Sequence, residues 1–456
     1  MADDGLTHNT TAIAFQLKRV YGKLLTALAA KQKMTYNLFE ESNRKAAIQP
    51  RGAGYYFGVR TKSNQAIGAR GEDEYLPDAL QPAGTQGVIL PKYVYGTLRL
   101  SGPALYAAKG NEAAFVEQQG DAVMDTYESL VEDLNRQCHG DGHGKLAVMS
   151  TSATSSTSAT WTVTCNNDLG VRYLKPGMVV DFYGSSGATP DSTCSSSRIS
   201  SINPITRVVT MEKCVDTTYN QYHPNSTMRA YTPGTSTSTG QTIASADVIV
   251  RQGARDAAWT SADTPVEMVG LLGQYDDSTL LAAHEGITIS SYPDFVANVL
   301  DNSGTNRALS LDLMLAAMDM TAARYGQQPN LIRMGLGQRR KYFALLAPDV
   351  RFAPGEFIGG YEKLAFSQNG AVSILVDPVT QPNKLFFEVD GLIKKYEMRP
   401  LGWLGEGEKM QLREHYDQWT MILAIYANLG VEARHGLTLL DDLTEPTGGT
   451  GGSMPF

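Results

Sequence analysis

The sequence predicts an α+β protein into which a small all-β region is inserted. Three observations predict this class. Residues 147–250 are rich in Ser and Thr and show short strand patterns with few helix signals, while helix-periodic segments lie on both sides. The chain after this region alternates helix and strand patterns. Two strand-like ends within residues 52–100 enclose a long, charged connection, as in an extended hairpin.

The composition and charge of the chain limit the kinds of protein it can be. The 456 residues carry a net charge of -8, with 42% hydrophobic and 19% charged side chains. These values are ordinary for a globular chain of about three folding units, and they leave no overall basic field to attract nucleic acid. No stretch approaches the roughly 20 apolar residues of a membrane span, and the first residues lack the basic and apolar parts of a signal peptide. We therefore expect folding in a cytosol, with no membrane partner.

The first half of the chain predicts two helices around the ribbon. Residues 11–31 form an amphipathic pattern without Trp, which favours packing on a protein partner over binding a membrane surface. Residues 111–138 predict one long helix, with Asn111 as N-cap and Gly140 as the stop. Its predicted apolar stripe is Val116, Val123, Tyr127, Leu130, Val131 and Leu134.

The ribbon of residues 52–100 is predicted from its alternating ends. Tyr93 and Tyr95 alternate with Val94 and Leu98, which indicates a strand. Long connections are uncommon inside a compact domain, and a two-stranded ribbon is only marginally stable by itself. We therefore expect something outside this subunit to hold the ribbon.

The inserted region predicts a small β-barrel or sandwich. Residues 173–184 form a Pro-Gly turn that runs into a strand, and residues 198–213 predict two strands around Asn203-Pro204. Cys165, Cys194 and Cys214 lie here, which leaves room for a single disulfide. In a reducing compartment, free thiols are the favoured interpretation.

The last part of the chain predicts a helix over residues 310–326, with Ser310 as cap and Gly326 as stop. Its predicted stripe is Leu315, Met318, Ala322 and Tyr325. Further strands are predicted at residues 330–336, 371–377 and 384–398, with a helix at 338–347. Residues 418–434 alternate with period two and predict a long strand, although a helix remains an alternative because so many of these residues are apolar.

The stretch NRQCHGDGHGKLA, residues 135–147, gathers Cys138, His139, Asp141 and His143 between glycines. Zinc needs three or four ligands in tetrahedral geometry, usually as two separated pairs. Cys138 and His139 are neighbours that point in different directions, and no second pair follows at the required spacing. The glycines favour a tight turn leaving a helix over a metal site.

No other pattern predicts catalysis. Residues 334–343 lack the third glycine of a dinucleotide site and the Gly-Lys-Ser/Thr of a P-loop, so Arg339, Arg340 and Lys341 are interpreted as a solvated helix face. The acidic run 72–74 on a charged loop is interpreted as solvated. We therefore expect no enzyme activity, no catalytic residue, and no metal or other cofactor.

The order of these parts resembles the major capsid protein of tailed double-stranded DNA bacteriophages, the Hong Kong ninety-seven type fold. Leu134-Asn135-Arg136 at the end of the long helix, followed by Gly140-Asp141-Gly142 and Gly144, is similar to the run that closes the spine helix in many of these proteins. The strand-then-helix segment PNLIRMGLGQRRKYFALL, residues 329–346, resembles part of the axial domain. The resemblance covers most of the chain except residues 147–250.

This resemblance implies a structural protein that self-assembles into pentamers and hexamers of an icosahedral head around packaged double-stranded DNA. It implies an α+β phage major-capsid fold whose parts have these ranges: N-terminal arm 1–50, extended β-hairpin loop 51–102, spine helix of the peripheral domain 103–146, inserted all-β domain 147–250, a return to the peripheral and axial domains 251–308, axial α/β domain 309–404, long strand of the peripheral domain and C-terminus 405–446, and flexible tail 447–456.

The resemblance also implies that the extended loop lies across a neighbouring subunit. The side chains that would meet opposite charges there are Arg60, Lys62, Arg70, Glu72, Asp73 and Glu74. Implied partners are further copies, a portal protein and a separate scaffolding protein, with a decoration protein left open; the DNA would be enclosed without specific binding. The location would be the virion, after assembly in the host cytoplasm. Some members crosslink a Lys of this loop to an Asn of another subunit, and Lys62 and Asn428 have the required residue types without matching a motif.

Two alternatives remain. One is an encapsulin-like nanocompartment shell of the same fold, which would enclose cargo enzyme instead of DNA. The other is a metal-dependent enzyme built on the cluster from Cys138 to His143.

Overall fold

The computed structural model describes residues 35–43, 47–49, 52–64, 66–78, 81–103, 118–154, 160–166, 169–184, 197–212, 242–252, 265–346, 365–367, 371–404, 411–412 and 417–445. These residues form several β-sheets and few helices, which confirms the α+β class. Other predicted features lie outside the described residues: the helix at 11–31, the cap Asn111, the tail 447–456, and Cys194 and Cys214.

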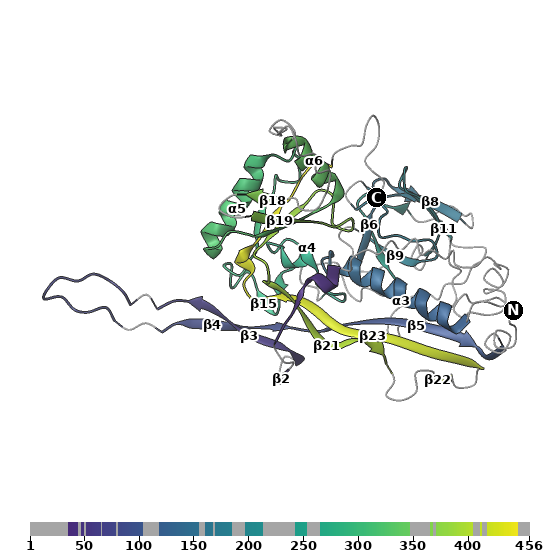
Figure 1. Cartoon of the computed structure of the whole chain (residues 1–456), viewed down its shortest axis with the longest axis horizontal. Coiled ribbons are helices and arrows are strands. Elements are labelled where there is room, and N and C mark those ends of the chain that lie inside the picture. Colours follow the sequence, from purple (N-terminus) through teal and green to yellow (C-terminus); the bar gives the residue numbers. More distant parts are fainter. Residues whose placement is uncertain are drawn as a thin grey trace, which may run out of the picture.

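A long sheet and one helix form the lower part of the molecule (Figure 1). The strands are β1 (Glu40–Glu41), β21 (Ile393–Trp403), β23 (Gln418–Val431), β22 (Gln411–Leu412) and β5 (Lys92–Ser101). Helix α3 (Gln118–Gln137) lies along this sheet and buries Leu130 and Leu134 in the same core as Leu423 and Ile425. The predicted long strand is confirmed, and it is β23. Tyr127, placed on the buried stripe of α3 by periodicity, is instead exposed.

A hairpin projects from one end of this sheet, as Figure 1 shows on its left side. It consists of β3 (Gly52–Lys62) and β4 (Ala83–Ile89), with β2 (Ala47–Gln49) on the other side of β3. The returning arm is therefore β4, while the predicted strand at residues 93–100 belongs to β5. Ten residues of β5 pair with β23, from Lys92 with Ala427 to Ser101 with Gln418.

The described part of residues 145–251 is all-β, in agreement with the strand pattern. Its six-stranded sheet contains β6 (Lys145–Val148), β13 (Val248–Arg251), β9 (Val179–Tyr183), β10 (Ser197–Asn203), β11 (Val208–Glu212) and β8 (Thr160–Thr164), in that order, beside the pair β7 (Ala153–Thr154) and β12 (Thr242–Ile243). Its own core includes Trp161 and Phe182. The first strand, β6, pairs with the last, β13. The chain therefore enters and leaves this region at one place.

The remaining part is a mixed six-stranded sheet with two helices beside it (Figure 1). The strands, in order, are β16 (Asn298–Leu300), β24 (Leu437–Leu440), β20 (Leu385–Glu388), β17 (Leu331–Met334), β19 (Ala371–Val376) and β18 (Ala365–Ser367). The helices are α5 (Leu311–Tyr325) and α6 (Leu336–Leu346). Short elements join the parts: η1 (Thr35–Leu38), α4 (Leu271–Gln274), β14 (Ala283–His284), β15 (Ile287–Thr288) and η3 (Arg434–Gly436).

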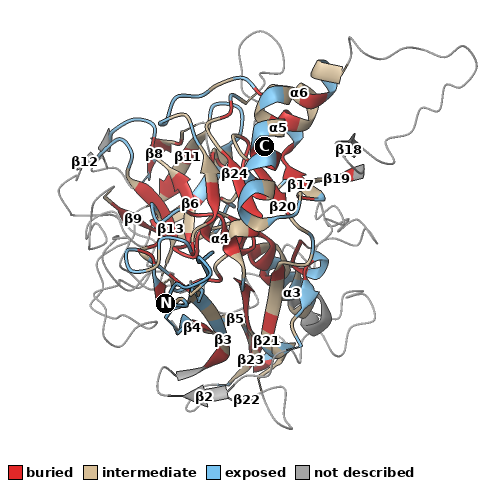
Figure 2. Cartoon of the chain, turned by 90° about the vertical axis from the view of Figure 1, so that its left-hand side faces the viewer, coloured by how far each residue is buried: buried red, intermediate tan, exposed pale blue. Residues whose placement is uncertain are grey.

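Helix α5 confirms the predicted caps but not the whole predicted stripe. The Ser310 hydroxyl accepts a hydrogen bond from the Leu313 N–H, and Gly326 ends the helix in the left-handed conformation, at φ 79°. The buried residues are Met314, Ala317, Met318 and Thr321, so only Met318 of the predicted stripe is fully buried. The buried face also includes the polar Thr321, whose hydroxyl lies 2.6 Å from that of Thr438 on β24. Figure 2 shows the buried residues gathered on the strands, with exposed residues on the outer sides of the helices.

Candidate functional site

The tip of the hairpin carries the charged side chains that the sequence singles out. Arg60, Lys62, Arg70, Glu72, Asp73 and Glu74 are all exposed, and none forms an ion pair with another described residue. Local hydrogen bonds shape the tip: the Arg70 Nε donates to the Tyr75 carbonyl at 3.1 Å, and the Gly71 N–H donates to Glu74 Oε2 at 3.0 Å. The six residues therefore face solvent.

The same tip exposes large apolar side chains, which the sequence reasoning missed. Ile67, Tyr75 and Leu76 are 84%, 97% and 82% exposed. Single exposed apolar residues are common, but three on one projecting loop form a surface suited to a partner. The signal was available in the sequence, as apolar residues inside an otherwise polar, charged connection.

The base of the hairpin is firmly packed. Tyr55 and Phe57 of β3 and Ile89 of β4 share a buried cluster with Ile287, Ile289, Phe295 and Tyr396. The rings of Tyr55 and Tyr396 have centroids 5.1 Å apart. The hairpin therefore has a fixed root on the body and an uncovered tip.

The two residue types needed for a crosslink occupy different environments. Lys62 is exposed on β3. Asn428 is buried on β23, where its Nδ2 donates to the Leu90 carbonyl at 2.8 Å and its Oδ1 accepts from the Val269 N–H at 3.1 Å. The Asn428 amide thus holds the chain between β4 and β5 and also binds the segment that contains Val269.

The stretch from Cys138 to His143 forms a buried turn after α3. Cys138 lies in the core beside the long sheet, and burial raises the pKa of its thiol well above the usual range. The His139 Nε2 lies 3.2 Å from Asp377 Oδ2, a carboxylate that also accepts a hydrogen bond from the Thr35 hydroxyl. Burial alone would raise the pKa of Asp377, but His139, Thr35 and the Val379 N–H together lower it to about 2.

The glycines of this stretch make the turn possible. Gly142 and Gly144 have φ values of 89° and 75°, which side chains disfavour. Asp141 Oδ1 accepts from the His143 N–H at 2.9 Å, and hydrogen bonds from His143 outweigh burial to hold the pKa of Asp141 well below its usual range. His139 and His143 therefore serve different partners, and within the described ranges no three His, Cys, Asp or Glu side chains gather as metal ligands.

The segment that returns from the β-rich region packs on this turn. The Leu271 N–H donates to the Cys138 carbonyl at 2.7 Å, and the Glu267 N–H donates to the Gly142 carbonyl at 3.0 Å. A Cβ on Gly270 would clash with the Gln137 and Cys138 carbonyls, so only glycine fits there. The stretch is thus the junction at which the β-rich region joins the body.

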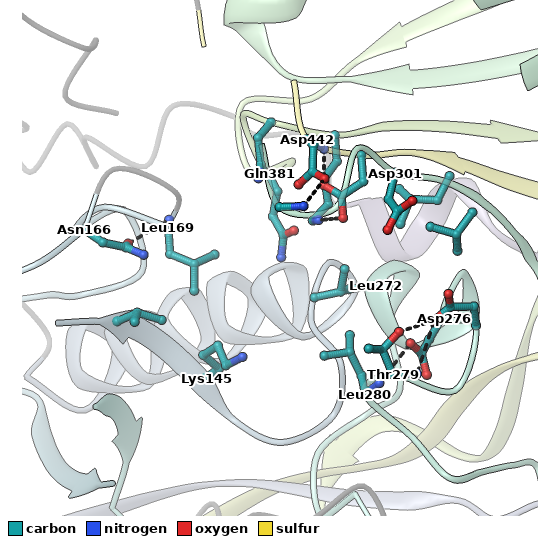
Figure 3. Close-up of a pocket in the computed structure, with 18 residues that line it drawn as sticks. Lys145, Asn166, Leu169, Leu272, Asp276, Thr279, Leu280, Asp301, Gln381 and Asp442 are labelled. Carbon is teal, nitrogen blue, oxygen red and sulfur yellow. Dashed lines mark hydrogen bonds and ion pairs between the residues drawn. The ribbon is translucent and has the colours of Figure 1, made fainter. Parts of the chain in front are cut away.

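Two cavities lie near this junction. The first, of about 390 Å³, has aspartates on its walls: Asp276, Asp277, Asp301, Asp441 and Asp442 (Figure 3). Most of them accept hydrogen bonds from the chain itself, as Asp442 Oδ2 does from the Asn302 and Gly304 N–H groups at 2.8 Å. The second, of about 880 Å³, lies between α3 and residues 171–178, and charged residues on its walls pair with each other, as Arg251 does with Asp133 at 3.0 Å. In the first cavity the Thr279 hydroxyl also donates a hydrogen bond to the Asp277 carboxylate.

No family model and no curated protein matches the chain. Among solved structures, the fold is similar to the capsid asymmetric unit of cyanophage A-1(L), over 90% of this chain and 92% of that chain, with 11% identity and a TM-score of 0.49. The capsid of the native GTA particle matches over 90% of both chains, with 8% identity and a TM-score of 0.42. The holo-SrpI encapsulin complex from Synechococcus elongatus PCC 7942 matches over 97% of this chain and 98% of that chain, with 10% identity and a TM-score of 0.40.

The sequence resemblance to phage capsid proteins is thus accompanied by a similarity to solved capsid structures. These are similarities of fold. Within the part of the chain that the structure describes, no helix combines the length and apolar character needed to cross a membrane.

Proposed function

We propose that this chain is the structural subunit of a self-assembling shell, of the major capsid protein type, whose pentamers and hexamers enclose packaged double-stranded DNA. The observation that carries the proposal is the projecting hairpin. Its root is packed on the body, whereas Ile67, Tyr75 and Leu76 at the tip are left in water. A surface of this kind marks an interaction site, and a neighbouring copy would cover it.

The other parts fit the same proposal. Helix α3 would be the spine helix, which with the long sheet forms the peripheral domain. The mixed sheet with α5 and α6 would form the axial domain around the five- and six-fold axes. The β-rich region, residues 147–250, would be an inserted domain, because β6 and β13 pair at its entrance and exit and its core is separate from that of the body.

The charge of the chain is consistent with a shell that assembles around DNA without binding tightly to it. A net charge of -8 disfavours attachment to packaged DNA. The six charged side chains from Arg60 to Glu74 would pair with opposite charges on neighbouring copies. In this proposal the chain has no catalytic role and acts in the virion, after assembly in the host cytoplasm with a portal protein and a separate scaffolding protein.

The experiment is assembly of the purified full chain, followed by sedimentation velocity and electron microscopy. We expect closed particles of tens of nanometres. Replacing residues 66–78 with a short Gly-Ser turn should leave folded subunits that form no closed shells. Ile205→Ser is the matched control, because Ile205 is 75% exposed on the turn between β10 and β11, away from the hairpin.

A stable monomer at high concentration, from the unaltered chain, would contradict the proposal. The contents of the particles separate the two kinds of shell. Double-stranded DNA in particles from infected cells supports a phage head, whereas a protein cargo would identify a nanocompartment.

A further inference from the structure

Glu285 occupies a position that disfavours its side chain. It lies in the two-residue turn between β14 and β15, where His284 pairs with Ile287. Glu285 has a φ of 51° and Gly286 a φ of 75°, so both central residues are left-handed, as in a type I′ turn. Such turns prefer Asn, Asp or Gly at the first of these positions. A glutamate in this conformation is therefore unusual.

The contacts of Glu285 join the hairpin to the body. Its backbone carbonyl accepts a hydrogen bond from the Val88 N–H of β4 at 2.7 Å. Its carboxylate Oε1 accepts from the Val431 N–H at the end of β23 at 2.6 Å. The fit is tight, because a Cβ on Gly430 would overlap Ile89 and lie 3.1 Å from Oε1. One residue therefore links the returning arm of the hairpin to the long sheet.

The second carboxylate oxygen is in an unfavourable place for a charge. Glu285 Oε2 lies in the interior without a hydrogen-bond partner among the described residues. Burial, with a smaller effect of Glu432, raises the pKa of Glu285 to about 8, against the opposing effects of the Val431 N–H and Arg434. The carboxyl group is therefore protonated through most of the neutral range.

The groups around Glu285 compensate its ionisation only in part, through the positive charge of Arg434. Arg434 of η3 already donates to the Gln274 and Asp276 carbonyls, at 2.6 and 2.9 Å. Tyr396 of β21 donates to Glu432, and the neighbouring His284 lies 3.3 Å from Asp276. From the hairpin side, β4 brings only the apolar Val88 and Ile89. An ionised Glu285 is thus a buried charge that Arg434 compensates only partly, because the two side chains form no ion pair or hydrogen bond among the described residues.

We propose that Glu285 is a pH-sensitive link between the root of the hairpin and the body. In the seated state the neutral side chain stays bonded to the Val431 N–H of β23 and holds β4. In the released state the ionised side chain leaves this position and β4 is freed. An ionised carboxylate is stable in water, so the released state has an ordinary pKa near 4.5. Because the seated state has the higher pKa, seating is fully favourable below about pH 4.5 and is weakened as pH rises. The equilibrium constant for release increases about tenfold per pH unit up to about pH 8 and then levels off.

Hydrogen exchange of the unassembled full chain, corrected for the intrinsic rate at each pH, tests this proposal. Between pH 5.5 and 9 the opening of β4 should increase about tenfold per unit and become constant above about pH 8. Glu285→Gln keeps an oxygen acceptor for Val431 without a titrating group, and its opening should not change with pH. Glu432→Gln removes a neighbouring negative charge, so it should keep the rise but level off at a lower pH.

A flat profile for the unaltered chain would overturn the proposal, and so would an unaltered slope in Glu285→Gln. If that variant does not fold, the profile of the unaltered chain and its displacement in Glu432→Gln decide the matter. The measurement requires no shells, so it can fail while the capsid proposal holds, and the reverse is equally possible.

Discussion

Arg136 and Glu267 form a buried ion pair, with Arg136 Nη2 2.7 Å from Glu267 Oε1. Arg136 lies in the last turn of α3, before the chain enters the β-rich region, and Glu267 lies where the chain returns. Arg136 also binds Asp133, at 3.0 Å. One guanidinium thus binds two buried carboxylates at the point where the two ends of the β-rich region meet, and Arg251 supplies a second positive charge to Asp133.

Arg136→Met should destabilise the body strongly, because it leaves the carboxylates of Glu267 and Asp133 in the interior with less compensation. Removing one partner of a buried pair costs about 3–5 kcal/mol. Urea denaturation of the two proteins measures the difference. Lys175→Ala, which breaks the exposed pair with Glu132, is the control and should cost less than about 1 kcal/mol. Equal effects of the two substitutions would contradict the account of the junction.

Gly270→Ala should prevent normal packing of the returning segment. Its Cβ would meet the backbone carbonyls of Gln137 and Cys138, which cannot rotate away. We expect a loss of about 2 kcal/mol or more, or insoluble protein, since overpacking a close contact commonly costs about 1–3 kcal/mol. Gly58→Ala, with no atom within 4 Å of its Cβ, should be tolerated. Thermal unfolding compares the three proteins.

The β-rich region should be removable as a unit. The chain leaves the junction at Gly144 and returns at Pro265, which lies against Gly142. Deleting residues 145–264 and joining the ends with a short Gly-Ser linker should leave a folded body, because the two cores share no buried residue. Near-native circular dichroism and one cooperative unfolding transition are expected. Loss of cooperative unfolding would show that the body requires contacts with the β-rich region, such as those of Arg172 and Tyr173 with the Thr380 and Val379 carbonyls.

Tyr75→Ser with Leu76→Ser should separate stability from assembly. Both side chains are exposed, so the unfolding free energy of the subunit should change by less than about 0.5 kcal/mol. The yield of closed particles should fall about tenfold or more, since buried aromatic anchors contribute about 2 kcal/mol each to an interface. Denaturation and electron microscopy of the same preparations provide both readouts. Unchanged particle yield would remove the hairpin tip from the proposed contacts.

His284 should contribute to loss of stability in acid. Burial and the nearby Arg434 lower its pKa to about 4, from an ordinary value of 6.5. Because the folded pKa is depressed, the contribution of the neutral side chain is complete above about pH 6.5 and is lost as pH falls towards 4. The difference corresponds to about 3 kcal/mol over that range. His284→Asn should flatten this part of the stability profile, whereas an unaltered profile would assign the loss to other groups.

Local chemistry made several elements predictable from sequence. Ser310 and Gly326 supply the cap and the stop of α5, and period-two alternation identifies β23. Contacts between distant segments were not predictable, because pairing over long separations leaves no local pattern. Periodicity therefore identified a strand near Tyr93 but could not show that it pairs with β23, at Tyr426, instead of with β3.

The candidate site, too, was predictable from sequence only in part. The charges of the hairpin were found as a composition shift, and the glycines after Cys138 predicted a turn. The roles of Arg136, Gly270 and Glu285 depend on partners 130 or more residues away in the chain. The sequence around each of these residues therefore contains no pattern that predicts its role.

Only Leu90 and Pro91 separate β4 from β5, and the Leu90 carbonyl is held by Asn428. Tension applied to the free end of the hairpin would therefore pass along the backbone into the strand that lies under α3, with no slack loop to absorb it. If such chains form the wall of a pressurised container, outward force would be carried along the polypeptide backbone and the hydrogen bonds between strands into neighbouring chains. The strength of the wall would then not depend on a single weak contact.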